Sequence, residues 1–295
     1  MRKLKNPAYL ASIFRQPFIR RLIAEGPGEL AATLNLAAFP YHARDSVAAA
    51  YEAVYASLLS SYRCEYIYKN TVASKILIGR HSPRTATLLT ELSVGDSKVD
   101  LVLLNGRSIA YEIKTELDTC RRLPVQVHDY QTVFDRVYVV GHGHNAEQLV
   151  TETPGSVGVL VLTREHRLRE IRKPVDAPFG FDKVAAFNML RRHEFLAVIR
   201  RHYGSVPKLP NTKIYRACRD LFLELSAQTL RADLMIALKT RRTWSEIASH
   251  LDSVPYALRF HAVTGNLQVD RLPMFSQPLG HHRRRPRSVL PLPAR

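Results

Sequence analysis

The chain has 295 residues, of which 46% are hydrophobic, so it can bury the core of one large domain with an appended module. Its 43 Lys and Arg residues against 26 Asp and Glu residues give a formal net charge of +17. A charge of this sign and size favours a polyanionic partner, most often nucleic acid. Three widely spaced cysteines, Cys64, Cys120 and Cys218, exclude both a disulfide framework and a Cys-x-x-Cys metal site.

The first 44 residues predict a basic, helical N-terminal segment that is interrupted at "EGPGE". Its apolar stretches are broken by charged residues and proline, so no signal-peptide core is predicted, and no later run is long enough to span a membrane. We therefore expect a cytoplasmic protein without a membrane partner. Residues 45–70 then predict one long helix that Asp45 or Ser46 could cap.

Five short runs of β-branched and apolar residues follow, at 85–94, 99–105, 108–115, 136–141 and 157–163. Between the third and fourth runs, residues 117–135 have helical spacing, with Pro124 in the first turn. A three-strand meander followed by a helical crossover predicts an α/β core, residues 45–170, with a mixed sheet flanked by helices. Residues 171–272 predict a C-terminal helical module, and residues 273–295 a basic, disordered tail.

The third strand contains "YEIKTELD", in which Glu112 and Lys114 project from one face while Ile113 points to the other. Buried charges need partners, and Asp100 opens the preceding strand. A two-residue Asn-Gly loop would place Asp100 on the opposite face from Glu112. A three-residue loop, Leu104 to Gly106, or an equivalent bulge, would place Asp100, Glu112 and Lys114 on one face.

Two carboxylates and a lysine on one sheet face suit a metal-dependent hydrolase. Asp100, Glu112 and the backbone carbonyl of Ile113 offer hard oxygen ligands for Mg²⁺ or Mn²⁺. Lys114 would orient a water or stabilise charge in the transition state. We therefore predict phosphodiester hydrolysis, with an internal ion-pair network as the alternative interpretation of these residues.

The pattern of Asp100, then Glu112-Ile113-Lys114, then Gln126-x-x-x-Tyr130 resembles the PD-(D/E)xK nuclease superfamily, whose RecB-like members carry the Q-x-x-x-Y element. The resemblance covers roughly residues 50–165. It implies a restriction-endonuclease-like fold, dependence on a divalent metal and a nucleic-acid substrate. By the same resemblance, Gln126 and Tyr130 would support the lysine, the attacking water or the scissile phosphate.

Many members of the superfamily add a further acid to the metal site, and here Glu65 and Glu91 are the two candidates. The arginines of the tail, Arg283, Arg284, Arg285 and Arg287, are predicted to contact nucleic acid. DNA is favoured over RNA as substrate, in defence, repair or mobile-element biology. A protein partner or a homodimer, a non-catalytic nucleic-acid-binding protein on the same fold, and an RNA-cleaving toxin-like nuclease are the alternatives.

Overall fold

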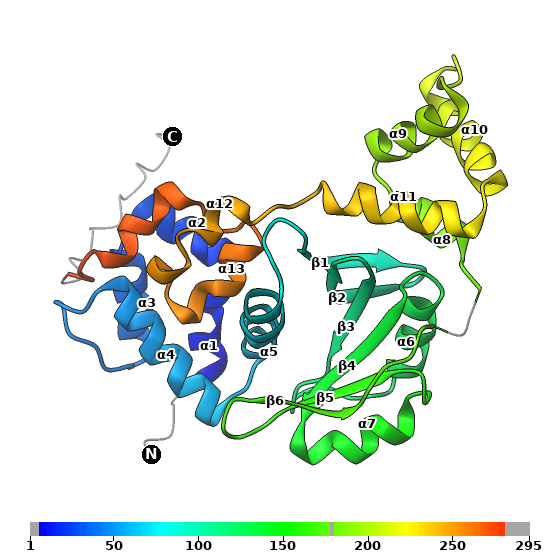
Figure 1. The fold of residues 1–295 in the computed structure, drawn as a ribbon. Helices are drawn as coiled ribbons and strands as arrows, with labels where there is room; N and C mark the ends of the chain where they lie inside the picture. Colours follow the sequence, from blue (N-terminus) through cyan, green and yellow to red (C-terminus); the bar gives the residue numbers. More distant parts are fainter. Residues whose placement is uncertain (1–5, 178–179, 281–295) are drawn as a thin grey trace, which may run out of the picture.

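A computed structural model describes residues 6–177 and 180–280 of the chain, and its centre is a six-stranded sheet (Figure 1). The strands lie in the order of the sequence: β1 (Thr87–Val94), β2 (Ser97–Leu104), β3 (Ser108–Ile113), β4 (Arg136–His142), β5 (Gly158–Leu162) and β6 (Leu168–Arg172). β1, β2 and β3 form an antiparallel meander, β3, β4 and β5 run parallel, and β6 is antiparallel to β5. The predicted mixed α/β sheet flanked by helices is confirmed.

Two elements of this core were not predicted. β6 carries the sequence "LREIR", whose side chains are exposed or only partly buried, so it lacks the apolar run of the other strands. Between β4 and β5 the chain forms a short helix, α7 (Ala146–Glu152), with a single 3₁₀ turn, η3 (Gly143–Asn145), before it. α7 buries only Leu149, which is too little periodicity to predict a helix.

One face of the sheet packs against helices from both ends of the described chain. Leu101, Leu103, Tyr111 and Ile113 point into this first core cluster. Its N-terminal helices are α1 (Pro7–Ala11), η1 (Ser12–Phe14), α2 (Gln16–Glu25), α3 (Gly28–Leu36), α4 (Val47–Ser61), α5 (Glu65–Val72) and the π-helical η2 (Ala73–Ile78). Its C-terminal helices are α12 (Ser245–Ala248), η4 (Leu251–Ser253), η5 (Tyr256–Leu258), α13 (Arg259–Val263) and η6 (Val269–Ser276).

The single helix predicted for residues 45–70 is in fact two helices. Ser46 caps α4 by accepting a hydrogen bond from the Ala49 amide at 3.1 Å. α4 ends where Tyr62 takes a non-helical conformation, with φ −155° and ψ 83°. The chain then begins α5 at Glu65, so this acid lies in the first turn of a new helix beside the sheet rather than in the middle of a long one.

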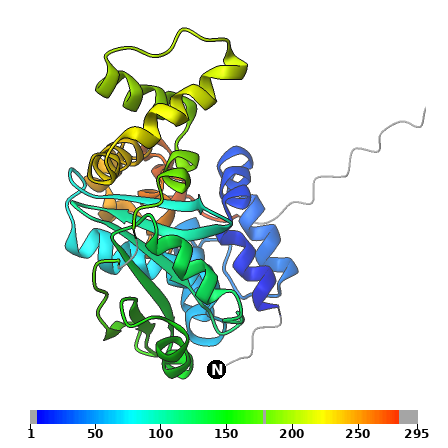
Figure 2. The same ribbon diagram turned by 90° about the vertical axis from the view of Figure 1, so that its right-hand side faces the viewer.

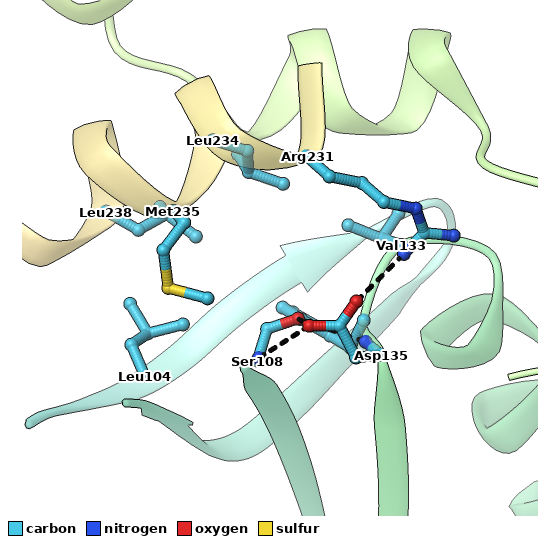
Figure 3. A pocket seen from close by; sticks show the side chains of 9 residues that line it. Leu104, Ser108, Val133, Asp135, Arg231, Leu234, Met235 and Leu238 are labelled. Atoms are coloured by element: carbon cyan, nitrogen blue, oxygen red, sulfur yellow. Dashed lines mark hydrogen bonds and ion pairs between the residues drawn. The ribbon is translucent and has the colours of Figure 1, made fainter. Parts of the chain in front are cut away.

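The other face of the sheet packs against α6 (Leu123–Gln131), α7, α8 (Lys183–Met189) and α11 (Ala227–Lys239). α9 (Arg192–Tyr203) and α10 (Asn211–Glu224) complete the same core cluster by packing on α8 and on each other. Both views show α9 and α10 extending away from the sheet (Figures 1 and 2). α11 docks through Leu234, Met235 and Leu238, which line a small cavity above Leu104 (Figure 3). Beside it, Arg231 pairs with Asp135 at 3.2 Å (Figure 3).

The structure refines the expected C-terminal organisation in two ways. Residues 171–272 are largely helical after β6, but their first helices lie in one core cluster and α12 to η6 lie in the other. Residues 273–280, expected to begin a disordered tail, are ordered because Leu279 is buried and its amide donates to the Asp45 carbonyl at 2.9 Å. Across residues 6–177 and 180–280, the helices are too short or too polar to cross a bilayer.

Candidate active site

The hairpin between β2 and β3 places the predicted acids side by side. Leu101 pairs with Tyr111 and Leu104 with Ser108, which leaves a three-residue loop whose middle residue, Gly106, has a φ of +70°. The odd loop length is confirmed, but the loop begins at Asn105 and not at Leu104. Leu104 is fully buried in the second core cluster, so it stays in the strand while the more polar Arg107 takes the loop position.

Continuation of this register sets Asp100 opposite Glu112, whereas the expected loop of Leu104 to Gly106 would have set it opposite Ala110. The predicted shared face of the two acids is confirmed, because residues opposite each other in a ladder point to the same side of the sheet. The two are linked through the backbone as well, because the Ile113 amide donates to Asp100 Oδ2 at 2.7 Å. The carbonyl of Ile113 stays a predicted ligand.

One hydrogen-bonded network connects the end of β3 to α6, and it consists of Glu112, Lys114, Gln126 and Tyr130. Lys114 Nζ lies 2.8 Å from Glu112 Oε1 and 2.8 Å from Gln126 Oε1. The Tyr130 hydroxyl lies 2.9 Å from Glu112 Oε2 and 2.8 Å from the Lys98 carbonyl. Glu112, Lys114 and Tyr130 are all buried, so the network satisfies charges that would be costly alone.

A second group of acids lies at the outer side of this network. Glu65 from α5, Glu91 from β1 and Asp100 from β2 each place a carboxylate oxygen within 4.8 Å of the other two. Three oxygen ligands at this separation suit a hard divalent cation such as Mg²⁺ or Mn²⁺. Among the described residues, this group contains both acids expected to complete the metal site, Glu65 and Glu91. It does not contain the predicted ligand Glu112, whose two oxygens are occupied by Lys114 and Tyr130.

Glu91 reaches the group through an unusual backbone conformation. Thr90 pairs with Leu101 and Leu92 with Val99, so Glu91 falls opposite Asp100 in the ladder. Its φ of +56° is a left-handed value that a non-glycine residue adopts at a cost of about 1 to 3 kcal/mol. Strain of this kind is often concentrated at functional sites, and here it coincides with the acid group.

The pKa of Asp100 depends on both the acid group and the network that contains Glu112. Burial, followed by the charge of Glu112, raises the pKa of Asp100 from 3.8 to about 7. Burial also raises the pKa of Tyr130, and the charge of Glu112 adds to it, so the phenol stays a hydrogen-bond donor to that carboxylate. A carboxyl group whose pKa is raised in this way binds a cation more readily as pH increases, because the cation competes with a proton.

Lys69 is a site residue that the sequence analysis missed. Its ammonium pairs with Glu65 one turn earlier on α5, with Glu91 at 2.5 Å, and lies 4.0 Å from Asp100. Burial alone would lower the pKa of Lys69, but the surrounding carboxylates raise it. The spacing of Glu65 and Lys69, four residues apart on a helix, was the signal that could have drawn attention to it.

Two acids of the group, Glu65 and Glu91, line a surface hollow together with Lys69. Part of its wall comes from both ends of the described chain: Ala11, Phe14, Arg15, Gln16, Phe260, His261 and Asn266. This wall is far from the motif in sequence, so motif spacing alone gives no indication of it. The predicted contacts of Arg283, Arg284, Arg285 and Arg287 lie outside the described residues.

Comparison with known proteins gives one family. No curated protein matches the chain at a significant level. Among solved structures, a protein of unknown function from Silicibacter pomeroyi is similar at 14% identity and a TM-score of 0.28, over 43% of this chain and 87% of its own. Residues 59–253 match the family described as Bacteriophage P4 protein cII, and because that match spans more than half of the chain, the protein belongs to this family.

Proposed function

We propose that the protein is a metal-dependent phosphodiesterase of the PD-(D/E)xK type that hydrolyses nucleic acid, with DNA favoured over RNA. The observation that carries the proposal is the pair of contacts from α6. Gln126 accepts a hydrogen bond from Lys114, and Tyr130 contacts Glu112, each at the position where the Q-x-x-x-Y element would act. A structural ion pair would also need such partners, but the spacing of Gln126 and Tyr130 on α6 is that of the Q-x-x-x-Y element.

Glu65, Glu91 and Asp100 are the residues proposed to hold Mg²⁺ or Mn²⁺, with Glu112 and the Ile113 carbonyl adjoining them. A cation bound there lowers the pKa of a coordinated water and offsets negative charge on a phosphodiester. Lys69 stabilises the three carboxylates in the metal-free protein and would have to share them with the cation. This competition predicts a weaker metal site than the three carboxylates alone would form.

Lys114 is proposed to act on the reacting groups directly. An ammonium has three N–H donors, and Glu112 and Gln126 take two of them. The third can donate to the attacking water or to a non-bridging phosphate oxygen, where negative charge increases as the new P–O bond forms and the leaving P–O bond breaks. Glu112 and Gln126 fix the direction of that donor, and Tyr130 fixes Glu112.

A non-catalytic nucleic-acid-binding protein is the second candidate function, and Lys69 favours it. The ammonium already neutralises the acids that a metal would use, as in an internal ion-pair network. RNA cleavage at the same residues is a third candidate. The three cysteines are free thiols, which supports the proposal of a reducing, cytoplasmic setting.

The test is a cleavage assay on purified protein. Circular and linear DNA, single- and double-stranded, and single-stranded RNA are incubated with Mg²⁺, Mn²⁺ or EDTA. The proposal expects products with a divalent cation and none in EDTA, and none from Lys114→Met. Cleavage of RNA alone would change the substrate class, and cleavage of nothing, with binding retained, would favour the non-catalytic protein.

A further inference from the structure

A strongly basic hollow adjoins the candidate active site. Arg20 from α2, Arg242 from the segment after α11, and Arg271 from η6 line it, and all three side chains are exposed. None of the described residues that line this hollow is acidic. Three guanidinium groups gathered without a lining carboxylate attract an anion with several charges rather than a single internal partner.

The three arginines come from distant parts of the sequence, and the fold brings them together. Arg242 lies against Gly265, where an added Cβ would approach its Nη1 within 2.9 Å, so the glycine leaves room for the guanidinium. Arg271 pairs with Asp270 at 3.1 Å, but both side chains are more than half exposed, so this pair contributes little and is easily exchanged. The neighbouring Arg21 differs from Arg20, because it pairs with Glu29 on α3.

The basic hollow and the hollow of the acid group share two residues. Gln16 and Asn266 line both, and Gln16 Nε2 lies 2.5 Å from Asn266 Oδ1. A chain lying over this shared wall would run from the three cations to Glu65 and Glu91 of the candidate metal site. A phosphodiester backbone has charges repeated along one strand, which matches this arrangement.

A second basic hollow is less suited to this role. It lies at the carboxyl ends of β4 and β5 and contains Arg63, Arg164 and Arg169, together with Glu116 and Glu165. Arg63 is already used to tie the fold together, since its Nη1 donates to the Leu162 carbonyl at 3.2 Å. The hollow of Arg20, Arg242 and Arg271 carries more uncompensated charge.

We infer that Arg20, Arg242 and Arg271 bind the phosphates of a nucleic-acid strand and lead it over Gln16 and Asn266 to Glu65, Glu91 and Asp100. The inference rests on the proposed function for the identity of the ligand. It adds a binding surface, with residues from both ends of the described chain, to a site otherwise built from the sheet, α5 and α6. Contacts of this kind hold the backbone and do not read bases.

The test is a binding titration in EDTA, so that it does not depend on cleavage. Short fluorescein-labelled single-stranded DNA and RNA of the same sequence are titrated over a range of salt concentrations, and affinity is followed by fluorescence anisotropy. The test variant combines Arg20→Gln, Arg242→Gln and Arg271→Gln. The matched control combines Arg200→Gln, Lys213→Gln and Arg216→Gln, three exposed cations on α9 and α10.

Loss of three phosphate contacts should reduce the salt slope on single strands by about 2 and weaken binding at least about tenfold at about 100 mM salt. The control variant should bind like the wild type. Equal affinity and slope in the test variant, or an equal loss in the control, would overturn the inference, as would a wild type that binds neither strand. A wild type that binds through these arginines but cleaves nothing would keep the inference and reject the nuclease.

Discussion

Replacing Asp100 by asparagine should stabilise the metal-free protein while removing metal-dependent cleavage. The pKa of Asp100 rises from 3.8 to about 7 on folding, through burial and the charge of Glu112, and this net shift already includes the attraction of Lys69. Between these two pH values the folded state holds a proton that the unfolded chain has released, so the free energy of unfolding falls as pH rises from about 4 to about 7 and then levels off. Asparagine can still accept from the Ile113 amide but carries no charge.

The rise in the pKa of Asp100 corresponds to a gain for the Asp100→Asn variant of about 4 kcal/mol at pH 8 and about 2 kcal/mol at pH 5. Thermal melts in EDTA at both pH values measure it, with Asp96→Asn, an exposed acid in the turn between β1 and β2, as the control. We expect the variant to melt several degrees above the wild type at pH 8, with a smaller difference at pH 5. A variant that melts below the wild type at pH 8 would refute the reasoning, because Asp100 would then be a stabilising partner of Lys69.

Three further predictions concern the network, a buried histidine and the tail. Lys114→Met leaves the buried Glu112 carboxylate with Tyr130 as its remaining partner, so the free energy of unfolding should fall by about 3 to 5 kcal/mol. Adding Glu112→Gln should restore most of this loss. Equal melting temperatures of Lys114→Met and the wild type would contradict the prediction. Burial lowers the pKa of His261 from 6.5 to about 4, so the unfolded chain takes up a proton first as pH falls. The free energy of unfolding should therefore drop by about 3 kcal/mol between pH 6.5 and pH 4. Urea unfolding over this pH range checks the prediction, and His261→Gln should show a flatter profile than the wild type. Deletion of residues 281–295 removes five arginines and should flatten the salt dependence of nucleic-acid binding while leaving the melting temperature unchanged. An unchanged slope of affinity against salt concentration would mean that these residues do not contact nucleic acid.

The chemistry of the motif predicted the shared face of Asp100, Glu112 and Lys114 better than turn statistics did. Asn-Gly favours a two-residue loop, but that loop would separate the acids, and the observed loop has three residues. Its start at Asn105 depends on the burial of Leu104 under α11, a contact more than a hundred residues away in sequence. The chemistry of the motif therefore predicted the odd length of the hairpin loop but not the residue at which the loop begins.

Other features depend on packing that no local pattern records. The pair of Glu65 and Lys69 has the spacing of an ordinary exposed helix pair, yet the Lys69 side chain is only 10% exposed because it lies among the acids of α5, β1 and β2. The break between α4 and α5 has neither glycine nor proline to mark it. Which amphipathic helices cover which face of the sheet is decided by tertiary complementarity, so one predicted helical module contributes to two cores.

The most direct test of the account is the single-turnover rate of DNA cleavage in Mn²⁺, measured for the wild type, Asp100→Asn and the Glu112→Gln/Lys114→Met pair. These variants are expected to stay folded, so a lost rate reports lost chemistry. We expect metal-dependent cleavage by the wild type and a fall in rate of at least about a thousandfold, or about 4 kcal/mol of transition-state stabilisation, in both variants. Cleavage at wild-type rate by either variant, or a wild type that cuts no substrate with any divalent cation, would contradict it.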